Sequence, residues 1–246
     1  MAFFRRNWFP ILLILAFGGG FLLPGVGTAL NRGAVATSAL VVYIFLVTGY
    51  TMPTEALLRG VTDVKLHLYV EGFIFIVFPL YVIATTSLLG NAFRPEVLAG
   101  LYALSVLPTT ISSCTVFTQA TGGNVAGTMF NAAFSNLAGV FLSPLLLSLL
   151  LQSTGRGLPV EQLGAIFLRL GLLMLAPIAV GQLLKRVLPG PARHRGKTLR
   201  KSTSIAILLI VYFNVARAAG DEVFVSNLSS MGWPVVYLVA SHLLLL

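Results

Sequence analysis

The sequence predicts an all-α polytopic membrane protein. Of its 246 residues, 57% are hydrophobic and only 9% are charged, and the mean hydropathy is +0.93. Soluble domains carry about a quarter charged residues. The apolar residues also gather in stretches of about 17–25 residues, which is the length that crosses a bilayer as a helix. The first expected partner of this chain is therefore the lipid bilayer.

Eight such stretches follow one another along the chain, and each predicts a transmembrane helix. Short loops join them, so we expect a single membrane transporter domain over residues 1–246. The predicted spans are 8–30, 34–52, 66–89, 97–117, 125–151, 163–188, 202–219 and 233–246.

The basic residues lie mainly between the spans and set the predicted orientation. Arg5 and Arg6 precede the first span, and a basic cluster at 185–201 lies between the sixth and the seventh. A cytoplasmic N-terminus places most of the 16 Lys and Arg residues on the cytoplasmic side, as the positive-inside rule requires. Topology thus explains the net charge of +9, and we expect no nucleic-acid partner.

The first stretch is predicted to be a retained span rather than a cleaved signal peptide, because its apolar run continues to residue 25 without a small-residue cleavage site. With no organelle-type presequence, the chain fits a bacterial inner (plasma) membrane. Cys114 and the three histidines lack metal-ligand spacing, and we place His67 and His194 near or in loops. We therefore expect no cofactor and no enzyme.

Residues 108–139 form a polar stretch inside this apolar chain. Pro108 removes a backbone donor, and Gly122 and Gly123 allow the chain to turn sharply. Hydroxyl groups that can bond freed carbonyls lie between them, at Thr109, Thr110, Ser112, Ser113, Thr115 and Thr118. Non-helical backbone at membrane depth is tolerated only where protein or a water-filled cavity satisfies it. The pattern predicts a discontinuous fourth helix.

The next span continues the polar pattern on one face. Asn124, Thr128, Asn131 and Ser135 follow one another at steps of four, three and four residues, which places them on one side of a helix. Oxygen ligands of this kind suit a hard cation such as sodium. The alternative is that these side chains are structural, since small and polar residues commonly join membrane helices.

Glu71 is the second candidate site residue. It lies within the first two turns of the third span, where a carboxylate is costly and should face a partner, an ion or a cavity. The alternative is an interfacial carboxylate that reaches water near Lys65 and His67.

The segment 107–146, supported by HLYVEGFIFIVFPL and GYTMPTEAL, resembles the bile acid:sodium symporter (BASS) family, and within it the SBF-like branch. The resemblance implies ten helices in two inverted five-helix repeats, with a panel domain, a core domain and unwound crossing helices. The matching sequences LLPG in the first span and VLPG in the sixth agree with inversion, because the second copy comes five spans after the first and an odd offset inverts it. We expect a first repeat at about 8–151 and an incomplete second repeat at 161–246.

The resemblance also implies a sodium site. Its candidate ligands in this sequence are Ser112, Ser113 and Thr115 from the fourth helix, Thr128 and Asn131 from the fifth, and Glu71, which occupies about the position of a third-helix glutamine. A carboxylate there could alter ion stoichiometry or introduce proton coupling. About eight of ten helices are expected, so the second crossing helix is missing from this sequence.

The predicted function is secondary active transport, with sodium as the coupling ion and a small organic anion, bile-acid-like or other, as the substrate. Alternating access would move the core against the panel. The alternatives are a truncated family member that does not transport, or a membrane regulator of ion handling. A completing partner or a homo-oligomer is compatible with either function.

Overall fold

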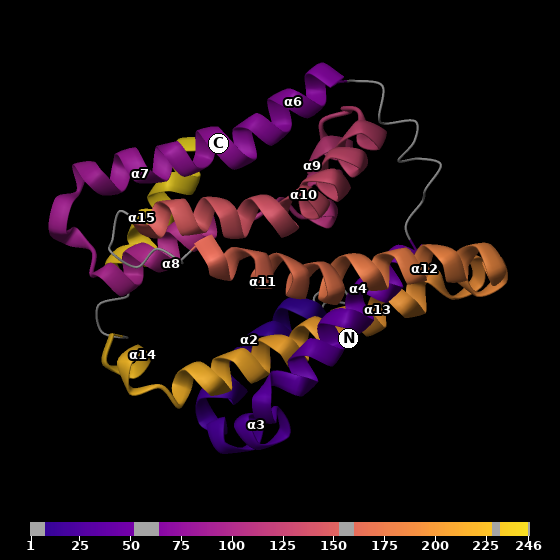
Figure 1. The fold of residues 1–246 in the computed structure, drawn as a ribbon, viewed down its shortest axis with the longest axis horizontal. Coiled ribbons are helices and arrows are strands. Elements are labelled where there is room, and N and C mark those ends of the chain that lie inside the picture. The colour runs from indigo at the N-terminus through magenta and orange to yellow at the C-terminus, as the bar shows by residue number, and fades with distance from the viewer. Residues whose placement is uncertain (1–7, 52–63, 153–159, 228–231, 246) are drawn as a thin grey trace. The chain divides into compact units, whose positions relative to one another are not determined.

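The computed structural model describes residues 8–51, 64–152, 160–227 and 232–245, which are helical apart from short connections (Figure 1). The predicted all-α class of a polytopic membrane protein is confirmed for these residues. Five helices are long and apolar enough to span a membrane, and a bent pair makes a sixth if it counts as one span: Arg32–Thr51, Val64–Leu88, Val125–Gln152, Gly164–Val187 and Lys201–Ala219, with the pair Trp8–Leu22 and Pro24–Leu30. The count of eight spans and the inverted repeats stay predictions.

The first predicted span is not a continuous helix. It consists of α2 (Trp8–Leu22) and α3 (Pro24–Leu30), which are bent relative to each other by 97°. Pro24 occupies the first turn of α3, where its missing N–H costs nothing, and Leu23 before it leaves the helical conformation. The predicted span over 8–30 is thus bent at Leu23, and whether it crosses the membrane as one span stays a prediction.

The chain divides into two compact units. Unit 1 is Met1–Met52 with Leu172–Gly232, and unit 2 is Pro53–Gly171 with Trp233–Leu246. The described helices of unit 1 are α2, α3, α4 (Val35–Thr51), α12 (Ala176–Val187), α13 (Pro189–Ala219) and α14 (Glu222–Asn227). Those of unit 2 are α6 (Val64–Gly72), α7 (Phe78–Leu88), α8 (Pro95–Ser105), α9 (Ile111–Ala120), α10 (Val125–Gln152), α11 (Val160–Leu170) and α15 (Gly232–Leu245).

Unit 1 is held together by close helix crossings at glycine. A Cβ added to Gly49 on α4 would overlap the carbonyl oxygen of Ile178 on α12, and one added to Gly181 would overlap that of Leu46. Gly20 and Gly27 lie equally close to α13, where an added Cβ would meet the side chains of Val215 and Ala216 respectively. Small residues let membrane helices approach closely, so van der Waals packing replaces the hydrophobic effect.

Unit 2 has a conventional buried cluster at one end. Val82, Phe93, Leu101 and Tyr102 bury their side chains together. Tyr237 of α15 packs on this cluster, with its ring edge-to-face against Phe93, and its hydroxyl lies 2.6 Å from that of Thr85. These contacts attach α15 to α7 and α8.

The third and sixth predicted spans each contain one π-helical turn. The turn η2 (Phe73–Val77) joins α6 to α7, and η4 (Gly171–Leu175) joins α11 to α12. Each is followed by a proline in the first turn of the next helix, at Pro79 and Pro177. Because proline removes a backbone donor and clashes with the carbonyl four residues earlier, a wider turn before it relieves the conflict.

Candidate functional site

The fourth predicted span is broken, as the sequence predicted. The helix α8 ends at Ser105, α9 begins at Ile111, and residues 106–110 between them are not helical. Side chains of α10 satisfy the freed carbonyls: the Ser143 hydroxyl donates to Val106 O at 2.6 Å, and the Asn136 amide donates to Thr109 O at 2.8 Å. The break is thus held at the surface of α10, as backbone at membrane depth requires.

The hydroxyls of the broken span mostly bond within their own segment. Thr115 donates to Ile111 O, and the Thr109 hydroxyl pairs with the thiol of Cys114. Thr110 and Ser113 are exposed, while the Ser112 side chain lies outside the described part of the structure. The described contacts of Thr109 and Thr115 thus stay inside their own segment, and the assignment of this set as ion or substrate ligands stays a prediction.

A second polar group lies where α9 turns into α10. The hydroxyls of Thr118 and Thr128 are 2.9 Å apart, and Thr128 also donates to Asn124 O. The side-chain oxygen of Asn124 accepts the backbone N–H of Gly127 at 2.9 Å, which is the hydrogen bond of a helix N-cap. Asn124 therefore has a structural role at the start of α10, and Gly122, at φ 70°, makes the turn before it.

The third polar group lies between α6 and the middle of α10, and it contains Glu71, His67, Asn131 and Ser135. His67 Nδ1 lies 2.6 Å from Asn131 Oδ1. An amide oxygen only accepts hydrogen bonds, so Nδ1 carries the proton. Asn131 and Ser135 are only 3% and 0% exposed. We call these four residues the Glu71 cluster.

Three oxygen atoms of this cluster are buried without a hydrogen-bonding partner. They are both carboxylate oxygens of Glu71 and the hydroxyl oxygen of Ser135, among the described side chains. The Ser135 side chain approaches the Glu71 carboxylate as a hydrogen-bonding group and the His67 ring acts on it electrostatically, but neither contact has the geometry of a well-formed hydrogen bond. The alternative in which Glu71 reaches water at the interface does not agree with this burial. Unsatisfied buried oxygens are rare and require an explanation such as a bound ion.

The surroundings of the cluster are apolar and carry little charge. The helix α10 contains no charged or histidine residue along its whole length. The ring of Phe130 packs on that of His67 with centroids 4.4 Å apart, and Phe134 stacks on Phe130. The Glu71 carboxylate thus lies in a low-dielectric setting in which an uncompensated charge is costly.

The donor set fits a hard monovalent cation better than a transition metal. The described residues contain no group of three or more His, Cys, Asp or Glu side chains that could hold a metal ion. What they offer is oxygen: two from Glu71, one from Ser135, and the second lone pair of Asn131 Oδ1. Oxygen ligands with one formal negative charge suit sodium.

His67 is the member of the cluster that sequence reasoning missed. We placed it near a loop, but it lies on α6 one turn before Glu71 and bonds to Asn131. The spacing of four residues between His67 and Glu71 was the available signal, since such residues share a helix face. The predicted stripe on α10 divides in the structure. Asn131 contacts His67 and Ser135 approaches Glu71, whereas Thr128 pairs with Thr118 and Asn124 bonds within the start of α10.

Known proteins resemble this chain along most of its length. The model of the SBF-like CPA transporter family matches residues 7–246. Sodium/bile acid cotransporter 7 of Danio rerio is 31% identical over 212 residues, which are 85% of this chain and 62% of that protein. Its counterpart of the same name in Rattus norvegicus is 29% identical over 214 residues, 85% of this chain and 61% of the relative.

A bacterial relative is similar to the same degree. YfeH of Escherichia coli (strain K12) is 31% identical over 197 residues, which are 80% of this chain and 57% of that protein. The chain therefore spans about three fifths of the length of the curated relatives it matches.

Proposed function

Because the chain belongs to the SBF-like CPA transporter family, we propose that it is a secondary active transporter in which sodium bound at the Glu71 cluster drives the symport of an organic anion. A transporter of this kind couples the entry of an ion to that of a second solute by exposing one site alternately to either side of the membrane.

The observation that carries this proposal is the set of buried, unpartnered oxygens on Glu71 and Ser135. Leaving a carboxylate unpaired in an apolar setting is unfavourable, so a cation that binds there recovers the lost interaction. Asn131 completes the oxygen set and is itself held in place by His67. Sodium is the cation that we assign to this set.

The broken span supports the same proposal. Interrupted helices beside a midplane site are the usual construction of secondary transporters, because unwound backbone can serve as ligand. Here the break at 106–110 is bonded to α10 through Asn136 and Ser143, and α10 also carries Asn131 and Ser135. One helix thus connects the break with the Glu71 cluster.

The names of the relatives give the substrate class that we propose. Two of them are named sodium/bile acid cotransporters, which combines sodium with an organic anion. The bacterial relative and the basic N-terminus favour a bacterial inner membrane with the N-terminus in the cytoplasm.

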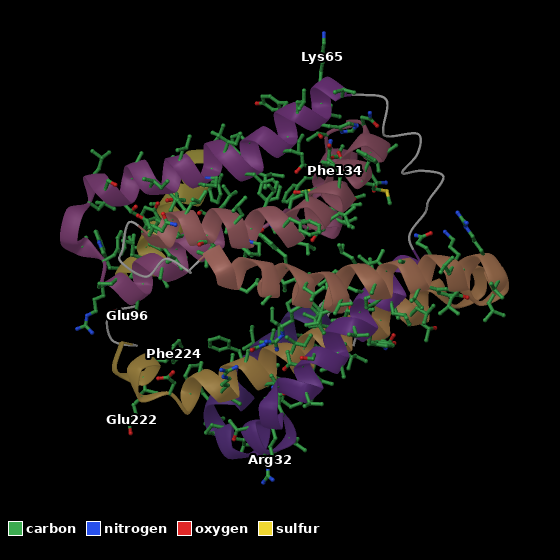
Figure 2. All side chains as sticks on the ribbon, in the orientation of Figure 1. Arg32, Lys65, Glu96, Phe134, Glu222 and Phe224 are labelled. Atoms are coloured by element: carbon green, nitrogen blue, oxygen red, sulfur yellow. The ribbon has the colours of Figure 1, made fainter. Side chains whose placement is uncertain are left out.

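Uptake into proteoliposomes tests the proposal. The purified 246-residue chain is reconstituted, and accumulation of radiolabelled taurocholate, a bile acid, is measured with an inward gradient of sodium or of choline. We expect uptake with sodium, its loss in Glu71→Gln, and its retention in Glu222→Gln. Glu222 is an exposed acid at the first turn of α14 and serves as the matched control (Figure 2).

The outcome separates the two parts of the proposal. Equal uptake with sodium and choline would contradict sodium coupling. Absence of uptake with either cation, together with binding of radioactive sodium to the purified chain, would contradict the organic-anion substrate and leave the cation site standing.

A further inference from the structure

The basic cluster at residues 185–201, where α12 ends and α13 begins, lies in a part of the sequence that is free of acidic residues. No Asp or Glu occurs between Glu161 and Asp221, and none precedes Glu55. The acidic residues of unit 1 are therefore Asp221 and Glu222, beyond the far end of α13. The basic members of the cluster are Lys185, Arg186, Arg193, Arg195, Lys197, Arg200 and Lys201.

Much of this cluster is a helical extension of a membrane span. The helix α13 begins at Pro189, whereas its part that is long and apolar enough to cross a membrane begins at Lys201. The helix thus continues for about 18 Å before the span begins. Arg193, Lys197 and Arg200 follow one another at steps of four and three residues, and by this register they share one helix face with Lys201. We call these four positions the basic face of α13.

Two aromatic residues of unit 1 indicate the depth of the cluster in the bilayer. The Nζ atom of Lys201 lies 5.5 Å from the centre of the Trp8 ring, and the Tyr50 hydroxyl donates to Leu188 O at 2.7 Å. Tryptophan and tyrosine gather where a membrane meets water, because each has an apolar ring and one polar group. The residues between these two contacts therefore lie at the level of the lipid headgroups.

The charges of the basic face repel one another within the helix. Arg193 and Lys197 are four residues apart, as are Lys197 and Lys201, and like charges at this spacing destabilise a helix. The first turn of α13 contains no acidic residue that would offset them. A negatively charged group bound at this face would remove the repulsion.

Phospholipid headgroups have the charge and the location that this face requires. Guanidinium groups bond phosphate oxygens in pairs, and clusters of basic residues beside a transmembrane helix attract anionic lipids. The positive-inside rule explains on which side of the membrane basic residues lie. It does not explain why they share one helix face in a region without acidic residues.

We propose that the basic face of α13 binds the headgroups of anionic phospholipids in the adjacent leaflet. The proposal requires only that unit 1 is inserted in a membrane, and it is independent of the transport function proposed above.

Quenching of Trp8 fluorescence by brominated lipid tests the proposal, because bromine quenches only indole rings that it contacts. The chain contains two tryptophans, so Trp233→Phe leaves Trp8 as the reporter beside Lys201. The purified 246-residue chain is reconstituted in phosphatidylcholine vesicles with a minor share of phosphatidylglycerol, and either lipid carries the bromine. We expect phosphatidylglycerol to be enriched about fivefold around Trp8 over its share of the bilayer, which is the effect of one basic residue at an anionic surface.

The other tryptophan provides a control for the reporter. In Trp8→Phe, the fluorescence comes from Trp233 on α15, and the sequence contains no Lys or Arg from residue 218 to residue 246. We expect quenching of Trp233 in proportion to the share of each lipid. Equal enrichment around both tryptophans would overturn the proposal, because it would not depend on the basic face.

Removal of charge from the basic face should abolish the enrichment around Trp8. The variant combines three substitutions, Arg193→Gln, Lys197→Gln and Arg200→Gln. Its matched control removes three exposed arginines elsewhere, with Arg32→Gln, Arg169→Gln and Arg217→Gln, and should keep the enrichment. Enrichment that survives the first set of substitutions would overturn the proposal.

Salt provides a test that needs no charge substitution. At about 1 M salt the Debye length falls to about 3 Å, so the enrichment around Trp8 should fall towards the bulk share of phosphatidylglycerol. Quenching of Trp8 that follows the bulk composition already at low salt would overturn the proposal. Loss of the enrichment on addition of inorganic phosphate at constant ionic strength would also overturn it, because the site would then select a soluble anion.

Discussion

The two units of this chain are built by different physical means. In unit 1, the helices α4 and α12 approach until backbone meets backbone at Gly49 and Gly181. In unit 2, one span is interrupted and α10 carries three successive polar groups, one of which leaves a carboxylate unpaired. On the function proposed above, unit 1 would serve as the framework and unit 2 would carry the cation site.

The largest effect is expected from a methyl group added in unit 1. Gly181→Ala places Cβ against the backbone of α4, which cannot move aside as a flexible side chain can. We expect a loss of about 3 kcal/mol in unfolding free energy, at the upper end for overpacking. Thermal unfolding in detergent measures it. Gly18→Ala in α2, where the same methyl meets open space, should change the stability little. Equal losses of unfolding free energy in the two variants would show that the close crossing at Gly181 does not stabilise unit 1.

In unit 2, the second-largest loss of stability is expected from removing the hydrogen bond between Asn136 and the broken span. Asn136→Leu keeps the side-chain volume but removes the amide that donates to Thr109 O. A carbonyl left unsatisfied at this depth costs about 2 kcal/mol. Asn214→Leu is the control, because that amide bonds only a carbonyl of its own exposed helix turn. If both variants unfold at the same temperature, the break does not depend on α10.

Glu71→Gln should act in the opposite direction to the first two substitutions. Without sodium, the wild-type protein contains an unpaired carboxylate, and an amide in its place is neutral. We expect the variant in choline to be more stable than the wild type by about 1 kcal/mol. Chemical unfolding in choline chloride measures the difference. A destabilised variant would mean that the carboxylate already has a stabilising partner.

The smallest effect concerns the pair Thr118 and Thr128. A double-mutant cycle with Thr118→Val and Thr128→Val isolates the energy of their hydrogen bond, whose oxygens are 2.9 Å apart. We expect about 0.6 kcal/mol, the average for side-chain hydrogen bonds between membrane helices. A coupling energy of several kcal/mol between Thr118 and Thr128 would identify the start of α10, rather than Glu71, as the main polar site of unit 2.

Local sequence signals predicted the fold class and part of the candidate site. The break at Pro108 follows from a missing donor, and the shared face of Asn131 and Ser135 follows from helical periodicity. The same local signals indicated that Glu71 needs a partner, because a buried charge is costly wherever it lies.

The parts that were not predicted depend on tertiary contacts or on proline acting within a span. His67 gained its role by meeting Asn131, 64 residues away along the chain. The bond from Asn136 to Thr109 O likewise joins two helices. The bend at Pro24 and the π-helical turns before Pro79 and Pro177 interrupt stretches whose hydropathy is continuous, so an apolar pattern alone does not show them.

The most direct test of the central claim is the stabilisation of the purified chain by sodium, with choline at the same ionic strength as the reference. A ligand at a hundredfold excess over its dissociation constant raises the unfolding free energy by about 2.7 kcal/mol. We predict a sodium-specific increase in the wild type and in Glu222→Gln, and none in Glu71→Gln. A sodium effect that survives Glu71→Gln, or no sodium-specific effect in the wild type, would contradict the assignment of the Glu71 cluster as the cation site.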